Sequence, residues 1–121
     1  MQEIKNVVEK LADQLDGDVL CSDLSRSLYS SGASLYRIKP RAIVQPKSKD
    51  DLVKTVRFAQ EYKIPITARG GGTSRTGNEL GKGLVLDFSK HLNQVVTFNE
   101  NEKWVRVQPG IVLSESVSYT H

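Results

Sequence analysis

The sequence predicts an α/β domain in which a small parallel sheet, flanked by helices, passes into antiparallel strands. Residues 42–68 read as strand, helix and strand, and two parallel strands need such a connecting helix. A third apolar strand follows at residues 83–88, after a glycine-rich loop. Residues 93–98 and 103–108 alternate in the manner of a β-hairpin. Because antiparallel strands join the parallel unit, the architecture can also be classed as α+β.

The first predicted element is an amphipathic helix over residues 3–15. Its apolar residues recur at helical spacing and are Ile4, Val7, Val8, Leu11 and Leu15. We expect Asp16 and Gly17 to end this helix, with Gly17 acting as a C-terminal cap. The serine-rich segment 22–31 is expected to form a turn or a short helix.

Two strands frame the predicted parallel unit. Residues 42–45 form a short buried strand that stops at Pro46, because proline cannot donate a ladder hydrogen bond. Residues 64–68 form the second strand and lead directly into the glycine loop. Beyond the hairpin, residues 111–117 are a candidate helix start.

The helix of this unit has a clear beginning. Ser48 is expected to be its N-cap, and Asp50 and Asp51 lie in the first turn, where the helix dipole favours negative charge. The helix should run to about Tyr62. Its predicted buried face consists of Leu52, Val53, Val56, Phe58 and Ala59.

Composition narrows the class of protein. The 121 residues fit one small domain or a piece of a larger one, and the net charge of +3 is spread along the chain, so it does not indicate a nucleic-acid partner. The single cysteine, Cys21, excludes an intrachain disulfide and favours a reducing compartment. No metal-binding motif, signal-peptide core or membrane-spanning apolar run is present. We therefore expect a soluble, cytoplasmic protein.

The most informative segment is residues 68–78, ARGGGTSRTGN. It follows the second strand, and ligands of open α/β sheets bind at the carboxyl ends of strands. Glycines permit positive φ angles and a close approach of the backbone to a ligand, and successive free N–H groups suit phosphate oxygens. Thr73, Ser74 and Thr76 would add hydroxyl groups, and Arg69 and Arg75 would add positive charge. The composition fits a diphosphate site.

The spacing matches neither of the two commonest phosphate loops. A Walker A loop requires Gly-Lys-Ser/Thr after four spacer residues, and the dinucleotide fingerprint would need a third glycine where Arg75 stands. From these residues alone, a plain tight loop and an anion-binding loop both stay open.

The string RGGGTSRTGN resembles the pyrophosphate loop of the FAD-linked oxidases, the vanillyl-alcohol oxidase type of flavoprotein. The flanking segments that share this resemblance are AIVQPKSKDDLVKTVRFAQ (42–60), IPITA (64–68), GLVLDFSKHLNQVV (83–96) and VRVQPGIVL (105–113). Residues 23–44, DLSRSLYSSGASLYRIKPRAIV, are similar to the leading segment of the branch acting on 2-hydroxy acids, which has D-lactate dehydrogenase-like and glycolate oxidase-like members. The resemblance covers about residues 20–115.

The resemblance implies that the cofactor is FAD. The residues that would wrap the FAD pyrophosphate, mainly through backbone N–H groups, are Gly70, Gly71, Gly72, Thr73 and Ser74. Arg69 would open the loop, Gly77 and Asn78 would continue it towards the flavin, and Pro46 would pack near the adenosine side.

Each flanking residue also has a plainer interpretation. Pro46 could only end a strand, Asn78 could only cap a turn, and Arg69 could be a surface charge. Arg75 departs from the family, which often has an apolar residue there, so its role stays open. Asp87 is expected to be structural.

The resemblance implies that residues 1–121 form a single partial FAD-binding domain, the N-terminal half of one. The N-terminal helix falls in residues 1–20, and residues 114–121 form a tail that matches the family poorly. The family builds its substrate site in a separate cap domain. We expect His91 to be a solvated turn residue, and we assign no catalytic residue.

The functional hypothesis is the N-terminal portion of an FAD-dependent oxidoreductase. The full enzyme would transfer a hydride from a 2-hydroxy acid, such as lactate, glycolate or 2-hydroxyglutarate, to flavin, and the fragment alone would be inactive. The alternatives are a stand-alone nucleotide- or phosphate-binding module and an inactive truncated remnant. An unpaired sheet edge also predicts self-association.

Overall fold

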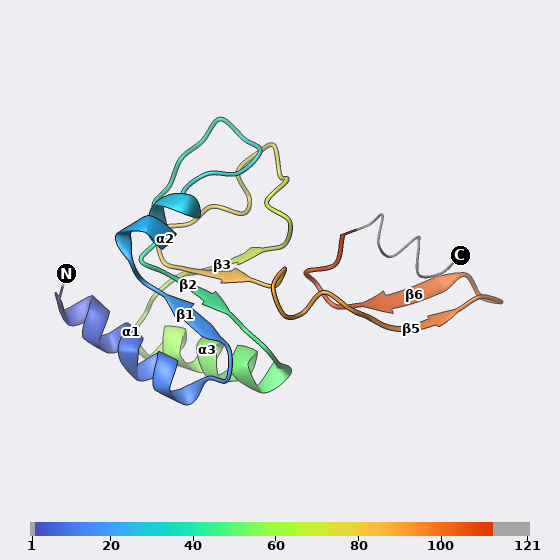
Figure 1. The fold of residues 1–121 in the computed structure, drawn as a ribbon, viewed down its shortest axis with the longest axis horizontal. Coiled ribbons are helices and arrows are strands. Elements are labelled where there is room, and N and C mark those ends of the chain that lie inside the picture. Colours follow the sequence, from blue (N-terminus) through green and yellow to red (C-terminus); the bar gives the residue numbers. More distant parts are fainter. Residues whose placement is uncertain (1, 113–121) are drawn as a thin grey trace.

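The computed structural model describes residues 2–112 and contains a four-stranded sheet and a two-stranded hairpin (Figure 1). The elements are α1 (Gln2–Gln14), β1 (Asp18–Leu20), α2 (Asp23–Leu28), β2 (Ala42–Gln45), α3 (Lys49–Glu61), β3 (Ile66–Arg69), β4 (Leu84–Asp87), β5 (Val95–Asn99) and β6 (Trp104–Val107). The sheet has the strand order β1-β2-β4-β3. Strands β2, β4 and β3 are parallel, and β1 is antiparallel to β2.

The predicted α/β class is confirmed, with two refinements. Strands β2 and β3 are parallel, as the strand–helix–strand pattern predicts, and β4, whose place in the sheet was not predicted, lies between them. Strand β1 was not predicted, because three residues are too few to show an alternating pattern. The hairpin of β5 and β6 forms as expected.

The core lies between the sheet and the helices α1 and α3, which cover the same face (Figure 1). The central strands β2 and β4 are buried along their whole length, as apolar strands in a parallel sheet should be. The helices contribute Val8 and Leu11 from α1 and Phe58 and Ala59 from α3.

The predicted face of α3 is wrong at two positions. Phe58 and Ala59 are buried, and Leu52 packs partly against the core, but Val53 and Val56 are exposed. Their places are taken by Asp51 and Thr55, which are fully buried. Both side chains can be buried because they are hydrogen-bonded: the Asp51 carboxylate accepts from backbone N–H groups, and Thr55 Oγ1 donates to the Asp51 carbonyl. Ser48 Oγ accepts from the backbone N–H of Asp51, as an N-cap should.

The corner between α1 and β1 differs from the predicted glycine cap. The helix ends at Gln14, and Gly17 does not have a positive φ. A Cβ at position 17 would instead lie 2.2 Å from the carbonyl oxygen of Gln45, so glycine is required by close approach. The Asp51 carboxylate accepts hydrogen bonds here from the N–H groups of Asp16 (3.0 Å), Gly17 (2.9 Å) and Lys47 (2.9 Å).

The β5–β6 hairpin projects away from the sheet (Figure 1). Most of its residues are exposed, including the large apolar side chains of Val96 and Trp104. The predicted helix start at 111–117 falls largely outside the described residues, as does the tail at 114–121.

Candidate functional site

The glycine loop leaves the sheet at the carboxyl end of β3. Strands β2, β4 and β3 end in register, because Arg69 pairs with Asp87 and Val44 pairs with Leu86. Gln45, Asp87 and Arg69 therefore stand side by side at one edge of the sheet. This edge is where open parallel sheets bind their ligands.

The glycines of the loop serve different needs. Gly72 (φ 71°) and Gly77 (φ 79°) adopt the left-handed conformation that glycine tolerates without cost. Among the described residues, a Cβ at Gly71 would meet nothing nearer than 3.8 Å, so they leave the space beside this residue open. The prediction that the glycines allow positive φ is confirmed at 72 and 77, and Gly71 offers room for a ligand.

The backbone N–H groups of the loop are free to bind. Within residues 2–112, none of the six N–H groups from Gly70 to Arg75 donates a hydrogen bond. The loop is instead held by Ser74, whose Oγ accepts from the N–H groups of Thr76 (3.4 Å) and Asn78 (3.3 Å). A row of successive free N–H groups is a concavity for an anion.

Arg69 lies beneath the loop and is not a free surface charge. Its guanidinium carbon lies 5.1 Å from the centre of the Tyr29 ring, which is a cation–π distance. Its side chain also lies against Gly72, because a Cβ there would be 2.8 Å from Arg69 Nη2. The Nη1 atom is buried and has no partner among the described residues. Arg75, in contrast, is exposed.

A hydrogen-bonded cluster forms the floor of this edge. The Tyr29 hydroxyl donates to Asp87 Oδ2 (2.5 Å) and accepts from Gln45 Nε2 (3.1 Å). Asp87 Oδ1 accepts from the N–H and hydroxyl of Ser89, so the structural role expected for Asp87 is confirmed. Burial, and then the Asp87 carboxylate, raise the pKa of Tyr29, which keeps its proton on the hydroxyl.

The remaining predicted residues flank the loop. Pro46 directly follows β2 at the same edge of the sheet, but its ring is fully buried. Thr73 and Asn78 are exposed, and Gly77 lies against Tyr36, where a Cβ would be 3.2 Å from the ring. The structure therefore brings Arg69 and the loop together at the carboxyl edge of the sheet, while Pro46 is buried after β2 and no contact with the loop is seen among the described residues.

Sequence reasoning missed Tyr29, Gln45 and Glu79. Glu79 ends the loop, and both of its carboxylate oxygens are buried without a partner in the described part of the chain. The other such side-chain atoms are Gln45 Oε1 and Arg69 Nη1. All of them belong to the loop or to the strand ends beside it, so the unsatisfied polar groups gather at the candidate site.

His91 is not the solvated turn residue that was expected. Its side chain is 19% exposed, and Nε2 lies 2.9 Å from Asp18 Oδ2, which links the turn after β4 to β1. Among the described residues, no group of three or more histidine, cysteine, aspartate or glutamate side chains is placed to hold a metal. No helix in that part of the chain is long and apolar enough to cross a membrane.

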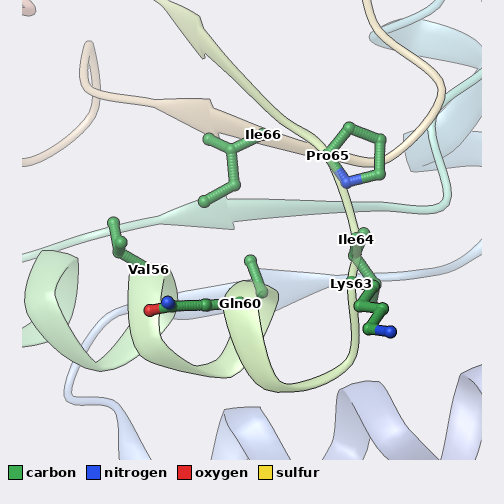
Figure 2. Close-up of a pocket in the computed structure, with 7 residues that line it drawn as sticks. Val56, Gln60, Lys63, Ile64, Pro65 and Ile66 are labelled. Carbon is green, nitrogen blue, oxygen red and sulfur yellow. The ribbon is translucent and has the colours of Figure 1, made fainter.

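A shallow apolar hollow lies elsewhere, at the opposite end of β3. Figure 2 shows its lining, which comes from α3 (Val56 and Gln60) and from the segment Lys63–Ile66 that leads into the strand. Because the glycine loop follows the other end of β3, this hollow is separate from the candidate site.

The fold and the site define an α/β protein of the open parallel-sheet class, in which a glycine loop with free backbone N–H groups leaves the carboxyl edge where such sheets bind ligands. The chain matches the FAD binding domain family over residues 40–121, and it belongs to that family. The family and the cofactor FAD, both expected from the resemblance, are thereby confirmed.

The relatives include enzymes of the expected branch. The chain is 32% identical to D-2-hydroxyglutarate dehydrogenase of Escherichia coli (strain K12), with 98% of this chain and 12% of the relative covered. It is 32% identical to glycolate oxidase subunit GlcD of Bacillus subtilis (strain 168), with 79% and 21% covered. It is 31% identical to mitochondrial D-lactate dehydrogenase (cytochrome) of Kluyveromyces lactis, with 97% and 21% covered. The chain thus spans only a small part of the length of these relatives.

Solved structures share the fold. Alkyldihydroxyacetonephosphate synthase superposes with a TM-score of 0.79 over 97% of this chain and 24% of that one, at 24% identity. For p-cresol methylhydroxylase the TM-score is 0.76 over 98% and 25%, at 21% identity.

Proposed function

We propose that this chain binds the diphosphate of FAD and is the N-terminal part of an oxidoreductase that acts on a small 2-hydroxy acid. The observation that supports the binding site is the row of free N–H groups from Gly70 to Arg75 at the carboxyl end of β3. Backbone donors at such an edge suit phosphate oxygens whatever the side chains are. The substrate class is supported by the names of the relatives alone.

In this proposal each predicted residue has a defined part. Gly70, Gly71, Gly72, Thr73 and Ser74 donate backbone N–H groups to the diphosphate. Arg69 supports the loop from below and adds positive charge beneath it. Gly77 and Asn78 continue towards the flavin, and Pro46 lies on the adenosine side.

Bound FAD would supply the hydride acceptor, while the chain binds and orients it. No described residue is proposed as a catalytic acid or base, so the chain alone should not turn over substrate. The full enzyme would require the residues that complete the flavin and substrate sites.

The test is a calorimetric titration of the 121-residue chain with FAD and, in parallel, with ADP. Gly71→Asp should abolish binding of both, because it places a carboxylate in the open space beside the free N–H groups. Gly71→Asn is the matched control: it has the same size without the charge, and it should keep more affinity than the aspartate variant.

Three results can be told apart. Binding of both ligands that is lost in Gly71→Asp supports the diphosphate site. ADP binding without FAD binding would favour the stand-alone nucleotide module. Failure to bind either ligand would contradict the proposed function and favour the inactive remnant.

We also propose that copies of the chain self-associate through the β3 edge. Strand β3 pairs only with β4 among the described residues, and exposed apolar side chains of Val53, Val56 and Ile66 lie on α3 and β3, two of them at the hollow of Figure 2. Unpaired edges with apolar neighbours tend to pair with another chain. Sedimentation should therefore show a mass that rises with concentration, and a monomer at high concentration would contradict this.

A cytoplasmic location is proposed on the basis of Cys21. This single thiol packs partly against the core and has no partner for a disulfide in the sequence. Cell fractionation that finds the chain outside the cytoplasm would contradict the assignment.

A further inference from the structure

Glu79 directly follows the glycine loop in the sequence, and its carboxylate is buried without a hydrogen bond to any residue that the structure describes. The residue is 4% exposed, and neither oxygen has a partner among the described residues. Burying a charged group in this way is unfavourable, so the few cases in a protein call for an explanation. The explanation must lie in what the side chain touches.

Glu79 fills the space beside Gly32. A Cβ on Gly32 would lie 2.0 Å from Glu79 Oε1 and 2.9 Å from its Cδ. It would also lie 3.0 Å from the carbonyl oxygen of Gly72. Gly32 does not have a positive φ, so its lack of a side chain is needed for space and not for backbone conformation.

The segment after Gly32 is tied to the loop. The N–H of Ala33 donates to the carbonyl of Gly72 at 3.1 Å. On its other side, Gly72 lies against the Arg69 guanidinium. The central residue of the loop is therefore packed between Arg69 and the backbone at 32–33, and the Glu79 carboxylate lies on the same side of Gly32 as the Gly72 carbonyl.

This packing controls the direction of a ligand-binding group. In a trans peptide the C=O and the following N–H point in opposite directions. Because the Gly72 carbonyl is held towards Ala33, the N–H of Thr73 must point away from that segment. Thr73 is one of the residues whose N–H is free.

We propose that Gly32 and Glu79 are positioning residues for the diphosphate loop. The missing side chain at 32 admits the Glu79 carboxylate, and the packed pair holds Ala33 where it fixes the Gly72–Thr73 peptide. The inference rests on the proposed function, because it names residues outside the loop that set the loop's affinity.

The experiment is a double-mutant cycle of Gly32→Ala and Glu79→Ala in the 121-residue chain, with ADP affinity measured by calorimetry. Gly32→Ala should weaken ADP binding about tenfold when Glu79 is present and about threefold or less when position 79 is alanine. Each comparison in the cycle is between two chains with the same residue at position 79. Any direct effect of Glu79 on ADP binding therefore cancels. Some loss remains in the double variant because the Gly72 carbonyl is still close.

Gly81→Ala is the matched steric control. A Cβ at Gly81 would lie 2.0 Å from Thr67 Oγ1, which is as close as a Cβ at Gly32 would lie to Glu79 Oε1. Gly81 lies between β3 and β4, in the connection that also contains Glu79. The substitution should lower stability, yet leave the ADP affinity of the folded chain within about twofold of the original.

A second readout does not depend on ligand. Hydrogen exchange at the Ala33 amide should speed up in Gly32→Ala and slow again in the double variant. If the original chain does not bind ADP, the proposed function fails. Hydrogen exchange at the Ala33 amide would still test whether Gly32 and Glu79 position that segment. If Gly32→Ala does not fold, the double variant must fold and bind.

The inference is overturned by either of two results. One is a Gly32→Ala chain that binds ADP as tightly as the original and keeps its Ala33 amide protected. The other is a double variant that recovers neither the affinity nor the protection.

Discussion

Asp51 and Glu79 are both buried carboxylates, yet their surroundings are opposite. Asp51 is 1% exposed and accepts three backbone hydrogen bonds, from Asp16, Gly17 and Lys47. Glu79 is 4% exposed and accepts none from the described residues. The Asp51 carboxylate links the α1–β1 corner to the start of α3. Glu79 directly follows the glycine loop, and its carboxylate packs against Gly32.

The difference separates a region built for stability from one built for binding. Both oxygens of the Asp51 carboxylate accept backbone hydrogen bonds, and each of these bonds stabilises the α1–β1 corner. In the region of the glycine loop and the adjoining strand ends, buried atoms of Arg69 and Gln45 also lack partners among the described residues, and the loop N–H groups are free. Unsatisfied polar groups reduce stability but leave hydrogen-bonding capacity for a ligand.

The same isosteric change should therefore have opposite effects at the two sites. Asp51→Asn should destabilise the chain by about 3 kcal/mol, because one oxygen becomes an NH₂ that faces backbone donors. Urea unfolding measures this. Asp50→Asn, at an exposed neighbour in the same turn, is the control and should change the midpoint little. A small loss for Asp51→Asn would mean that the three hydrogen bonds contribute little.

The effect of Asp51 should also depend on pH. Burial is the largest single influence on its pKa and raises it, but the N–H groups of Lys47, Asp16 and Gly17 together outweigh burial and bring the pKa below the ordinary 3.8. A carboxyl group with a lowered folded-state pKa stabilises fully above the unfolded value and loses that contribution as pH falls through the folded value. The stability gap between the original chain and Asp51→Asn should be full at neutral pH and close in acid. A gap that stays constant with pH would contradict this.

Glu79→Gln should have a smaller effect of the opposite sign. Replacing a buried carboxyl group that has no hydrogen-bond partner among the described residues by an amide should stabilise the chain by about 1 kcal/mol. The same urea experiment measures it, with Asp51→Asn as the paired variant. If Glu79→Gln proved as destabilising as Asp51→Asn, the Glu79 carboxylate would have hydrogen-bond partners in solution, and the contrast between the two regions would fail.

These two carboxylates also show what the sequence can and cannot predict. The glycine triplet and its position after a strand predicted the loop, and Ser48 predicted the start of α3, because both signals are local. Asp51 was placed correctly in the first turn, but its three partners lie in other segments. Tyr29 meets the loop only through the fold, and Glu79, which directly follows the loop, packs against the distant Gly32.

The face of α3 failed for the same reason. Val53 and Val56 belong to the apolar pattern of the helix, yet the side of α3 that faces the core is the one with the Asp51 corner. Hydrophobic spacing predicts the buried face of a helix from its apolar residues alone. Hydrogen bonds to a buried polar residue such as Asp51 can turn a different face towards the core. Residues that act through contacts distant in the sequence, such as Gly32, leave no local pattern.

Asp18 is a partly exposed carboxylate to compare with the buried Asp51 and Glu79, and its replacement should change stability the least. Its carboxylate is held by side chains, not by backbone: His91 Nε2 and Lys90 Nζ both lie 2.9 Å from Oδ2, and the hydrogen bond to His91 and then that to Lys90 lower its pKa. The side chain is 41% exposed, so water and salt screen the pair. Asp18→Asn should cost about 0.5 kcal/mol, and added salt should shrink that loss while leaving the Asp51→Asn loss unchanged. Urea midpoints at low and high salt measure both. If salt did not reduce the Asp18→Asn loss, the exposed Asp18 would behave like the buried Asp51. Solvent exposure would then not distinguish the two carboxylates.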